Sequence, residues 1–169
     1  MEAAQRQLEM SIRMFFKNED PIHNHTLATA AHEVLWNIGK KRKIRSILKD
    51  NPFIKKEKKA EFDDIVRSAS RFLKHGKYDF TETLDFNPEE NEYFLIDSIE
   101  MFQQLNSSPK IPPIMLLMKA WFQLAKPDLY ADSPESQKLR DFCQQIDLKP
   151  EDKSRFLAFE DDFKRIQLG

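Results

Sequence analysis

The chain contains four histidines, three of which lie close together in sequence: His23, His25, His32 and His75. A helix advances by about 100° per residue, so His25, His32 and Trp36 share one face of a helix expected over residues 22–38. Imidazoles two turns apart beside an indole could act as acid, base or ligand in a binding site. The alternative is a helix sandwiched inside a bundle, in which both imidazoles are hydrogen-bonded and have no chemical role.

A second group of candidate residues lies near residue 70. Arg71 and His75 are one helical turn apart on the polar face of a helix expected over residues 56–75, and Lys74 lies between them. An arginine that binds phosphate beside a histidine that transfers a proton is the minimum set for cleaving RNA, whose 2′-hydroxyl can serve as the nucleophile. The alternative is an ordinary solvated helix face, with His75 stabilised by the carbonyl end of the helix.

The sequence lacks the usual spacings of metal ligands. Carboxylate sites in helix bundles use Glu-x-x-His pairs, and none occurs in this sequence. His32-Glu33 is not followed by the second histidine of an HExxH motif. We therefore expect no metal site and no cofactor. The single cysteine, Cys143, lies on an apolar stripe with Leu139 and Phe142 and is expected to be buried rather than nucleophilic.

Apolar residues recur at three- and four-residue intervals along most of the chain, which is typical of helices that bury one face. Asn87-Pro88 and Ser133-Pro134 are start signals, and Gly39 is expected to end the first histidine-bearing helix in a left-handed C-cap. Residues 43–54 are expected to form a short helix or helical turn that ends before Pro52. The expected helices cover residues 3–17, 22–38, 56–75, 87–105 and 114–125, and two more that Pro134 and Pro150 open.

This pattern predicts an all-α fold. We expect a single bundle of about seven helices over residues 1–169, with a subdivision near residues 106–113 as the alternative. With only 3 glycines and 1 cysteine, the composition excludes glycine-rich phosphate loops, dinucleotide-binding motifs and disulfide frameworks. The longest apolar run, residues 114–125, is too short to span a membrane, and no signal-peptide core is present. We expect a cytoplasmic protein without membrane contact.

Positive charge is concentrated in one segment. Residues 40–59 hold ten Lys or Arg and two acidic residues, a net charge of +8, whereas the rest of the chain carries −9, giving −1 in total. Such a segment can neutralise phosphates, which makes RNA or a nucleotide a reasonable partner. The alternatives are a solvated connector, an acidic protein surface, or the acidic part of a second copy of the chain.

Three segments resemble a group of uncharacterised bacterial proteins: residues 19–35 (EDPIHNHTLATAAHEVL), 69–76 (ASRFLKHG) and 84–89 (LDFNPE). The later helical motif of that group resembles the HEPN superfamily. The resemblance covers residues 10–105 and implies an α-helical bundle, a homodimer and, in many members, a metal-independent RNase. In those members an Arg and a His separated by four to six residues meet across the dimer. Here three residues separate Arg71 from His75, and members that lack the motif are expected to bind nucleotides, RNA or proteins.

The sequence and the resemblance together predict a helical protein that binds RNA or a nucleotide. If it cleaves RNA, Arg71 would bind phosphate and His75 would be the general acid or base. The residues predicted to bind the ligand are His25, His32, Trp36 and Lys74. One alternative is a non-catalytic module that binds a protein partner or a second copy of itself. Another is a small-molecule site lined by His25, His32, Trp36 and Trp121.

Overall fold

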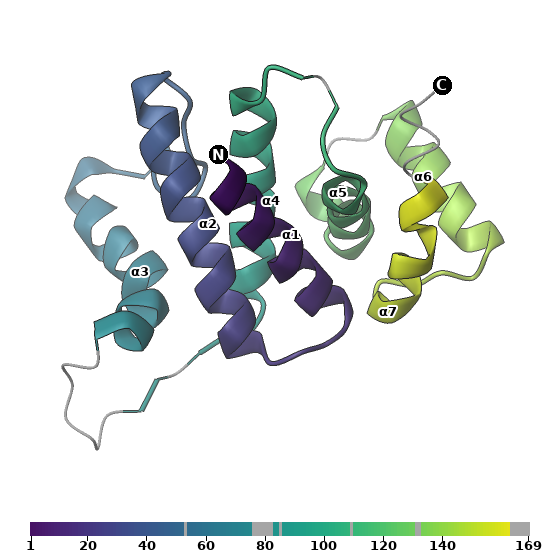
Figure 1. The fold of residues 1–169 in the computed structure, drawn as a ribbon, viewed down its shortest axis with the longest axis horizontal. Coiled ribbons are helices and arrows are strands. Elements are labelled where there is room, and N and C mark those ends of the chain that lie inside the picture. Colours follow the sequence, from purple (N-terminus) through teal and green to yellow (C-terminus); the bar gives the residue numbers. More distant parts are fainter. Residues whose placement is uncertain (53, 76–82, 85, 109, 131–132, 163–169) are drawn as a thin grey trace.

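The computed structural model describes residues 1–162, apart from residues 53, 76–82, 85, 109 and 131–132. These described residues form helices and turns without any strand, so the predicted all-α bundle of about seven helices is confirmed (Figure 1). The α-helices are α1 (Glu2–Phe16), α2 (Pro21–Lys41), α3 (Lys59–His75), α4 (Glu90–Leu105), α5 (Pro113–Ala125), α6 (Pro134–Gln145) and α7 (Lys153–Phe156). Short 3-10 turns are η1 (Lys56–Lys58), η2 (Pro127–Leu129) and η3 (Leu157–Phe159). None of the described helices is long and apolar enough to cross a membrane.

The helix α2 begins where expected but ends later than the sequence predicts. Asp20 caps it, because its Oδ1 accepts hydrogen bonds from the amides of Ile22 and His23 at 2.8 and 3.1 Å. The prediction that Gly39 ends this helix was wrong, since Gly39 lies inside it. The glycine instead permits a close approach: a Cβ there would lie 3.3 Å from the carbonyl oxygen of Ile44. The chain after α2 therefore folds back against the helix end.

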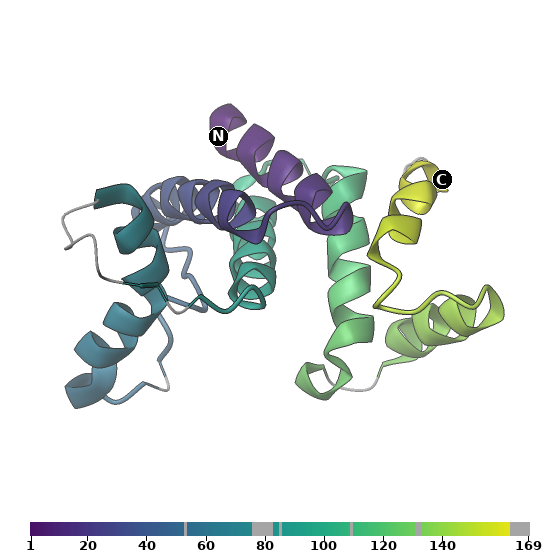
Figure 2. The same ribbon diagram turned by 90° about the horizontal axis from the view of Figure 1, so that it is seen from below.

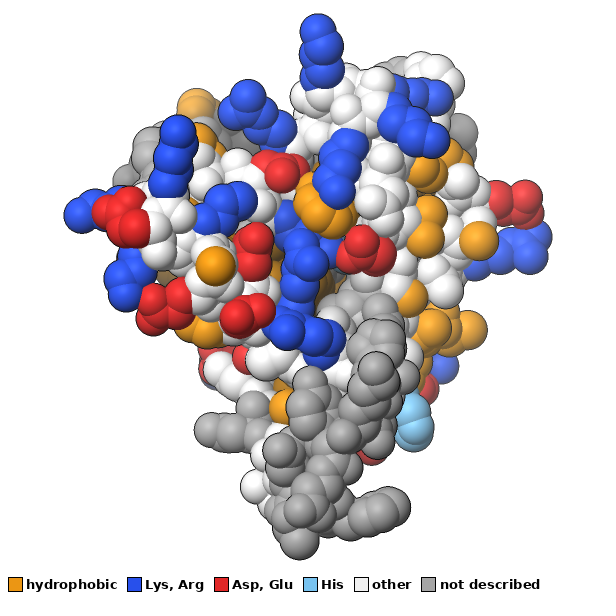
Figure 3. Space-filling view, turned by 90° about the vertical axis from the view of Figure 1, so that its left-hand side faces the viewer, with side chains coloured by type: hydrophobic (Ala, Val, Ile, Leu, Met, Phe, Trp, Pro, Cys, Tyr) orange, Lys and Arg blue, Asp and Glu red, His pale blue; other side chains and the backbone are white. Residues whose placement is uncertain are grey.

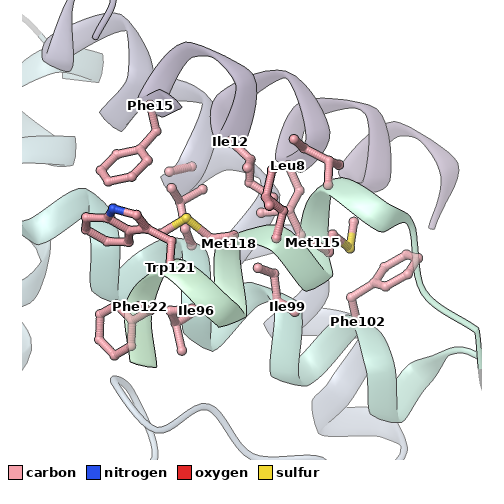
Figure 4. Close-up of a cluster of buried hydrophobic side chains, with 14 of the residues drawn as sticks. Leu8, Ile12, Phe15, Ile96, Ile99, Phe102, Met115, Met118, Trp121 and Phe122 are labelled. Carbon is pink, nitrogen blue, oxygen red and sulfur yellow. The ribbon is translucent and has the colours of Figure 1, made fainter. Parts of the chain in front are cut away.

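The buried core lies between α1, α2, α4 and α5. Leu8 and Ile12 of α1 face Met118 of α5, with Ile96 and Ile99 of α4 alongside (Figure 4). Seen from below, α1 lies across the bundle and packs against both α2 and α5 (Figure 2). The apolar spacing of α1 and the all-round apolar character of α5 are thus explained by burial. Cys143 is buried against this core, and burial raises the pKa of its thiol.

The helix α3 is covered much less well than α1, α2, α4 and α5. It packs on α2 at one end of the molecule, away from α6 and α7 (Figures 1 and 2). Of its apolar residues, Ala69 is buried, Val66 is half-buried and Ile65 is 61% exposed. This partial packing leaves room for a cleft between α2 and α3.

The role of the core can be tested on α1. Leu8→Ala removes a fully buried side chain, so we expect the free energy of unfolding to fall by about 2–5 kcal/mol. Met10→Ala on the same helix is the control, because Met10 is 54% exposed and its truncation should change stability by less than about 0.5 kcal/mol. Urea denaturation followed by circular dichroism measures both, and equal losses would contradict the packing described.

Candidate functional site

The buried carboxylate of Asp97 on α4 organises the polar part of the molecule. Its Oδ2 lies 2.7 Å from His32 Nε2 and accepts a hydrogen bond from Ser46 Oγ at 2.5 Å. Backbone amides of Ile47 and Leu48 donate to the same carboxylate at 2.8 and 3.2 Å. Burial opposes ionisation, but these contacts outweigh it and hold the pKa of Asp97 below its usual range. The ionised carboxylate therefore fastens residues 46–48 to α2 and α4.

The Ser46, His32 and Asp97 side chains do not form a nucleophilic triad. In such a triad the two ring nitrogens of the histidine contact the serine and the carboxylate separately. Here His32 Nε2 approaches both, Asp97 at 2.7 Å and Ser46 Oγ at 3.3 Å, and Ser46 donates directly to Asp97. All three side chains are buried. Their role is to hold the chain after α2 in place.

His25 also lies between α2 and α4. Its Nδ1 is 2.8 Å from Asn91 Oδ1, and its ring packs edge-to-face against Phe94 at 5.4 Å between centroids. The ring of His32 packs against the same phenylalanine at 5.2 Å. Both imidazoles are buried and hydrogen-bonded, which is the geometry of the sandwiched helix considered above. Trp121 lies on α5, where it packs against Phe15 and does not join them.

Three cationic side chains surround the indole of Trp36, one from α2, one from α3 and one from the loop between these helices. Lys40 Nζ lies 3.0 Å from the ring centroid, Lys49 Nζ 4.2 Å and the guanidinium carbon of Arg67 5.8 Å. The indole Nε1 donates to Asp50 Oδ2 at 2.8 Å, which fixes the half-buried ring. Cations are attracted to an aromatic face, and this attraction offsets part of their mutual repulsion.

Two of these cations line a cleft between α2 and α3 with a volume of about 120 Å³. We call it the α2–α3 cleft. In the space-filling view of this side, Lys and Arg side chains occupy the hollow at the centre, with Asp and Glu side chains on either side (Figure 3). The lining residues that matter for its chemistry are His32, Glu33, Lys49, Arg67, Ser70 and Arg71.

The charges inside the cleft are only partly balanced. Lys49 forms an ion pair with Glu33, and burial, together with the nearby Arg67 and Lys40, lowers the pKa of Lys49 despite that partner. The Arg67 Nε is buried and has no hydrogen-bond partner among the described residues. A buried donor without an acceptor costs free energy, so this guanidinium is suited to donate a hydrogen bond to an anionic ligand.

The predicted Arg71 and His75 pair is described only in part. Arg71 lines the cleft and donates from Nη2 to Asp64 Oδ1 at 2.8 Å. The helix continues through Lys74 and His75, but the side chains of these two residues lie outside the described part of the chain. Of the residues predicted for the site, the cleft thus brings together His32 and Arg71, with Trp36 beside it.

Several residues of the site have no conspicuous sequence motif. Lys49 and Arg67 belong to charged stretches that read as solvated, and their approach to Trp36 depends on how α3 packs. Asp97 does carry a signal, because it is a carboxylate that follows the apolar run of residues 93–96 and precedes Ile99 on the same helix. A charge at such a position requires partners, and that requirement could have revealed the polar cluster.

Comparisons of the chain with protein-family models, with curated proteins and with solved structures gave no match. Among the described residues, no three His, Cys, Asp or Glu side chains converge closely enough to hold a metal ion. The cationic α2–α3 cleft and its surroundings are the candidate site.

The Asp97 cluster predicts a particular pH dependence of stability. Because the pKa of Asp97 is lower in the folded state, its stabilisation is complete above the unfolded pKa of about 3.9 and is lost as the pH falls through the folded value. Asp97→Asn should lower the free energy of unfolding at pH 7 by about 3–5 kcal/mol and flatten the acid limb of the stability profile.

The control for this experiment is Asp128→Asn, since Asp128 is exposed on η2. Urea denaturation from neutral pH down to about pH 3 gives the profiles. Identical acid limbs in the wild type and Asp97→Asn would contradict the role assigned to the carboxylate.

Proposed function

We propose that the protein binds a phosphate-bearing ligand, either RNA or a nucleotide, in the α2–α3 cleft. The observation that carries the proposal is the buried Nε of Arg67, which has no acceptor among the described residues, in a cleft that also contains Lys49 and Arg71. A guanidinium presents several donors in a plane and binds phosphate oxygens in pairs, with shorter and stronger bonds than neutral groups form.

The charge balance supports an anionic ligand. Lys40, Lys49 and Arg67 surround one indole, whereas Glu33 and Asp50 are the nearby carboxylates that interact with Lys49 and Trp36. Asp50 also accepts a hydrogen bond from the amide of Ser46, so it serves the backbone as well. A bound phosphate would relieve the remaining repulsion between the cations and would compensate their loss of water.

The basic segment adds long-range attraction to this cleft. Lys49 lies within residues 40–59. Its carbonyl oxygen accepts a hydrogen bond from Lys59 Nζ at 2.8 Å, which brings α3 and the segment together. Most other cations of the segment are exposed. Clustered exposed cations attract polyanions, and counterions leave the nucleic acid when these cations neutralise its phosphates. The surroundings of the cleft are therefore suited to RNA as well as to single nucleotides.

We place this function in the cytoplasm and assign it to the homodimer that the family resemblance implies. Sedimentation of the protein with and without RNA tests the dimer. A non-catalytic module that binds a partner protein is the alternative function. A stable protein complex in the absence of any RNA or nucleotide affinity would favour it.

Removing Arg67 should weaken binding. We expect Arg67→Gln to lower the affinity for a single-stranded RNA by about tenfold or more, since a charged hydrogen bond contributes about 1.5–3 kcal/mol. The slope of log affinity against log salt should also fall, because fewer phosphates are neutralised. Fluorescence anisotropy at about 50 and 200 mM salt measures both quantities.

The matched control is Arg140→Gln on α6, which lies at the other end of the molecule (Figure 1). It removes the same charge, so a purely global electrostatic effect would weaken binding equally in both variants. Absent or salt-independent binding by the wild type, or equal effects of the two variants, would refute binding at the cleft.

We expect bound RNA to remain uncleaved. Arg71 forms an ion pair with Asp64, His32 Nε2 is held by Asp97, and the spacing of Arg71 and His75 departs from the RNase pattern. Incubation of RNA with the wild type and His75→Ala in the presence of EDTA tests this expectation. Cleavage by the wild type that disappears in His75→Ala would instead establish a metal-independent RNase, with Arg71 as phosphate binder and His75 as acid or base.

A further inference from the structure

A second hollow, of about 430 Å³, lies between the chain after α2, the helices α4 and α5, and η2. We call it the aromatic hollow. Tyr93, Phe122 and Tyr130 form its wall in an edge-to-face series, with centroids 5.7 Å apart for the first pair and 6.2 Å for the second. Its volume is in the range that small ligands or single groups of a polymer occupy.

At the edge of this hollow, three large hydrophobic side chains are exposed to solvent. Ile47 is 61% exposed, Leu129 is 60% exposed and Tyr93 is 38% exposed, and all three line the same hollow. Polar groups stand beside them, since Arg45, Glu100 and Gln104 also line it, together with Asp97, whose carboxylate already has its own partners. An aromatic wall with a few polar groups at its rim suits a flat ligand that has hydrogen-bonding edges.

The aromatic hollow is connected to the basic segment through one residue. Arg45 lines it and also lines a broad open hollow of about 560 Å³, whose other cations are Lys40, Lys43 and Lys59. Lys40 in turn contacts the indole of Trp36 at the α2–α3 cleft. Positively charged side chains therefore lead from the cleft, along the basic segment, to the mouth of the aromatic hollow.

We infer that the aromatic hollow binds a nucleobase of a single-stranded nucleic acid whose phosphates follow this series of cations. The inference rests on the proposed function and narrows its ligand from any phosphate-bearing molecule to a polynucleotide strand. Single-strand binding combines a cationic groove for the backbone with aromatic rings on which bases stack. Tyr93 offers the exposed ring, and Arg45 stands where the phosphate of the inserted nucleotide would enter.

The polar rim provides partners for the edge of a base. The Gln104 amide carries donors and an acceptor, and the Glu100 carboxylate carries acceptors. Glu100 forms an ion pair with Lys119 at 2.7 Å, which holds it at the rim. A purely aliphatic ligand would exclude water from these polar groups and would offer them no hydrogen bonds in return, so a base fits the hollow better.

The experiment compares two single strands of about 12 nucleotides, one with normal bases and one abasic, which have the same charge. Tyr93→Ala should weaken binding of the normal strand by about fivefold or more and leave the abasic strand unaffected. Tyr93→Phe keeps the ring and should bind as the wild type does. A fluorescent adenine analogue in the strand should be quenched by the wild type and by Tyr93→Phe, but less by Tyr93→Ala.

A second pair of variants guards against a folding defect. Gln104 on α4 and Gln144 on α6 are both exposed, but only Gln104 lines the hollow. Gln104→Ala should therefore weaken binding of the normal strand, and Gln144→Ala should not. These two substitutions remove no buried group, so their effects report on the hollow rather than on stability.

The outcomes separate this inference from the proposed function. If both strands bind equally and Tyr93→Ala changes neither, the hollow takes no base, whereas phosphate binding at the cleft stands. If neither strand binds, the inference fails, and the proposed function then requires that a single nucleotide binds at the cleft with an affinity that Arg67→Gln lowers. A dimer that Tyr93→Ala dissociates, without any change in strand affinity, would assign the hollow to self-association and overturn the inference.

Discussion

The ionised carboxylate of Asp97 is the constraint on which the polar half of the molecule depends. It is buried on α4, so it must be compensated, and it collects its partners from two other parts of the chain. His32 comes from α2, and Ser46 and the amides of Ile47 and Leu48 come from the loop that follows. A single charge thus determines where that loop runs.

The position of the loop sets the surroundings of the candidate site. Ser46 lies just before Lys49 and Asp50, so fixing the loop brings Lys49 to Glu33 and Asp50 to the indole of Trp36. The amide of Ser46 also donates to Asp50. The cluster at Asp97 and the cations at Trp36 are therefore successive parts of one loop, and a disturbance of the first would displace the second. Through this linkage, the buried network at Asp97 would influence the ligand binding proposed at the α2–α3 cleft.

Sequence patterns predicted the helices well because these depend on local spacing. The apolar face that contains Leu8 and Ile12 and the buried position of Cys143 follow from periodicity alone. Gly39 failed as a stop signal because its role is a tertiary approach to Ile44, which local propensity does not contain. The site was harder to predict for the same reason. Asp97 and Ser46 form a hydrogen bond although 51 positions separate them in the sequence. No local pattern around either residue predicts the other as its partner.

The buried cationic groups around Trp36 are not explained by a contribution to folding stability alone. Lys49 is buried with one carboxylate partner, and Arg67 carries a buried Nε without a described acceptor. Apolar residues of similar volume often stabilise such positions at least as well as ion pairs do. Chains that retain costly buried charge commonly use it at a functional site. An anion in the cleft would oppose the influences that lower the pKa of Lys49, namely burial and the neighbouring cations, and would give Arg67 its acceptor. Binding would then complete an interaction network that the folded chain leaves partly unsatisfied.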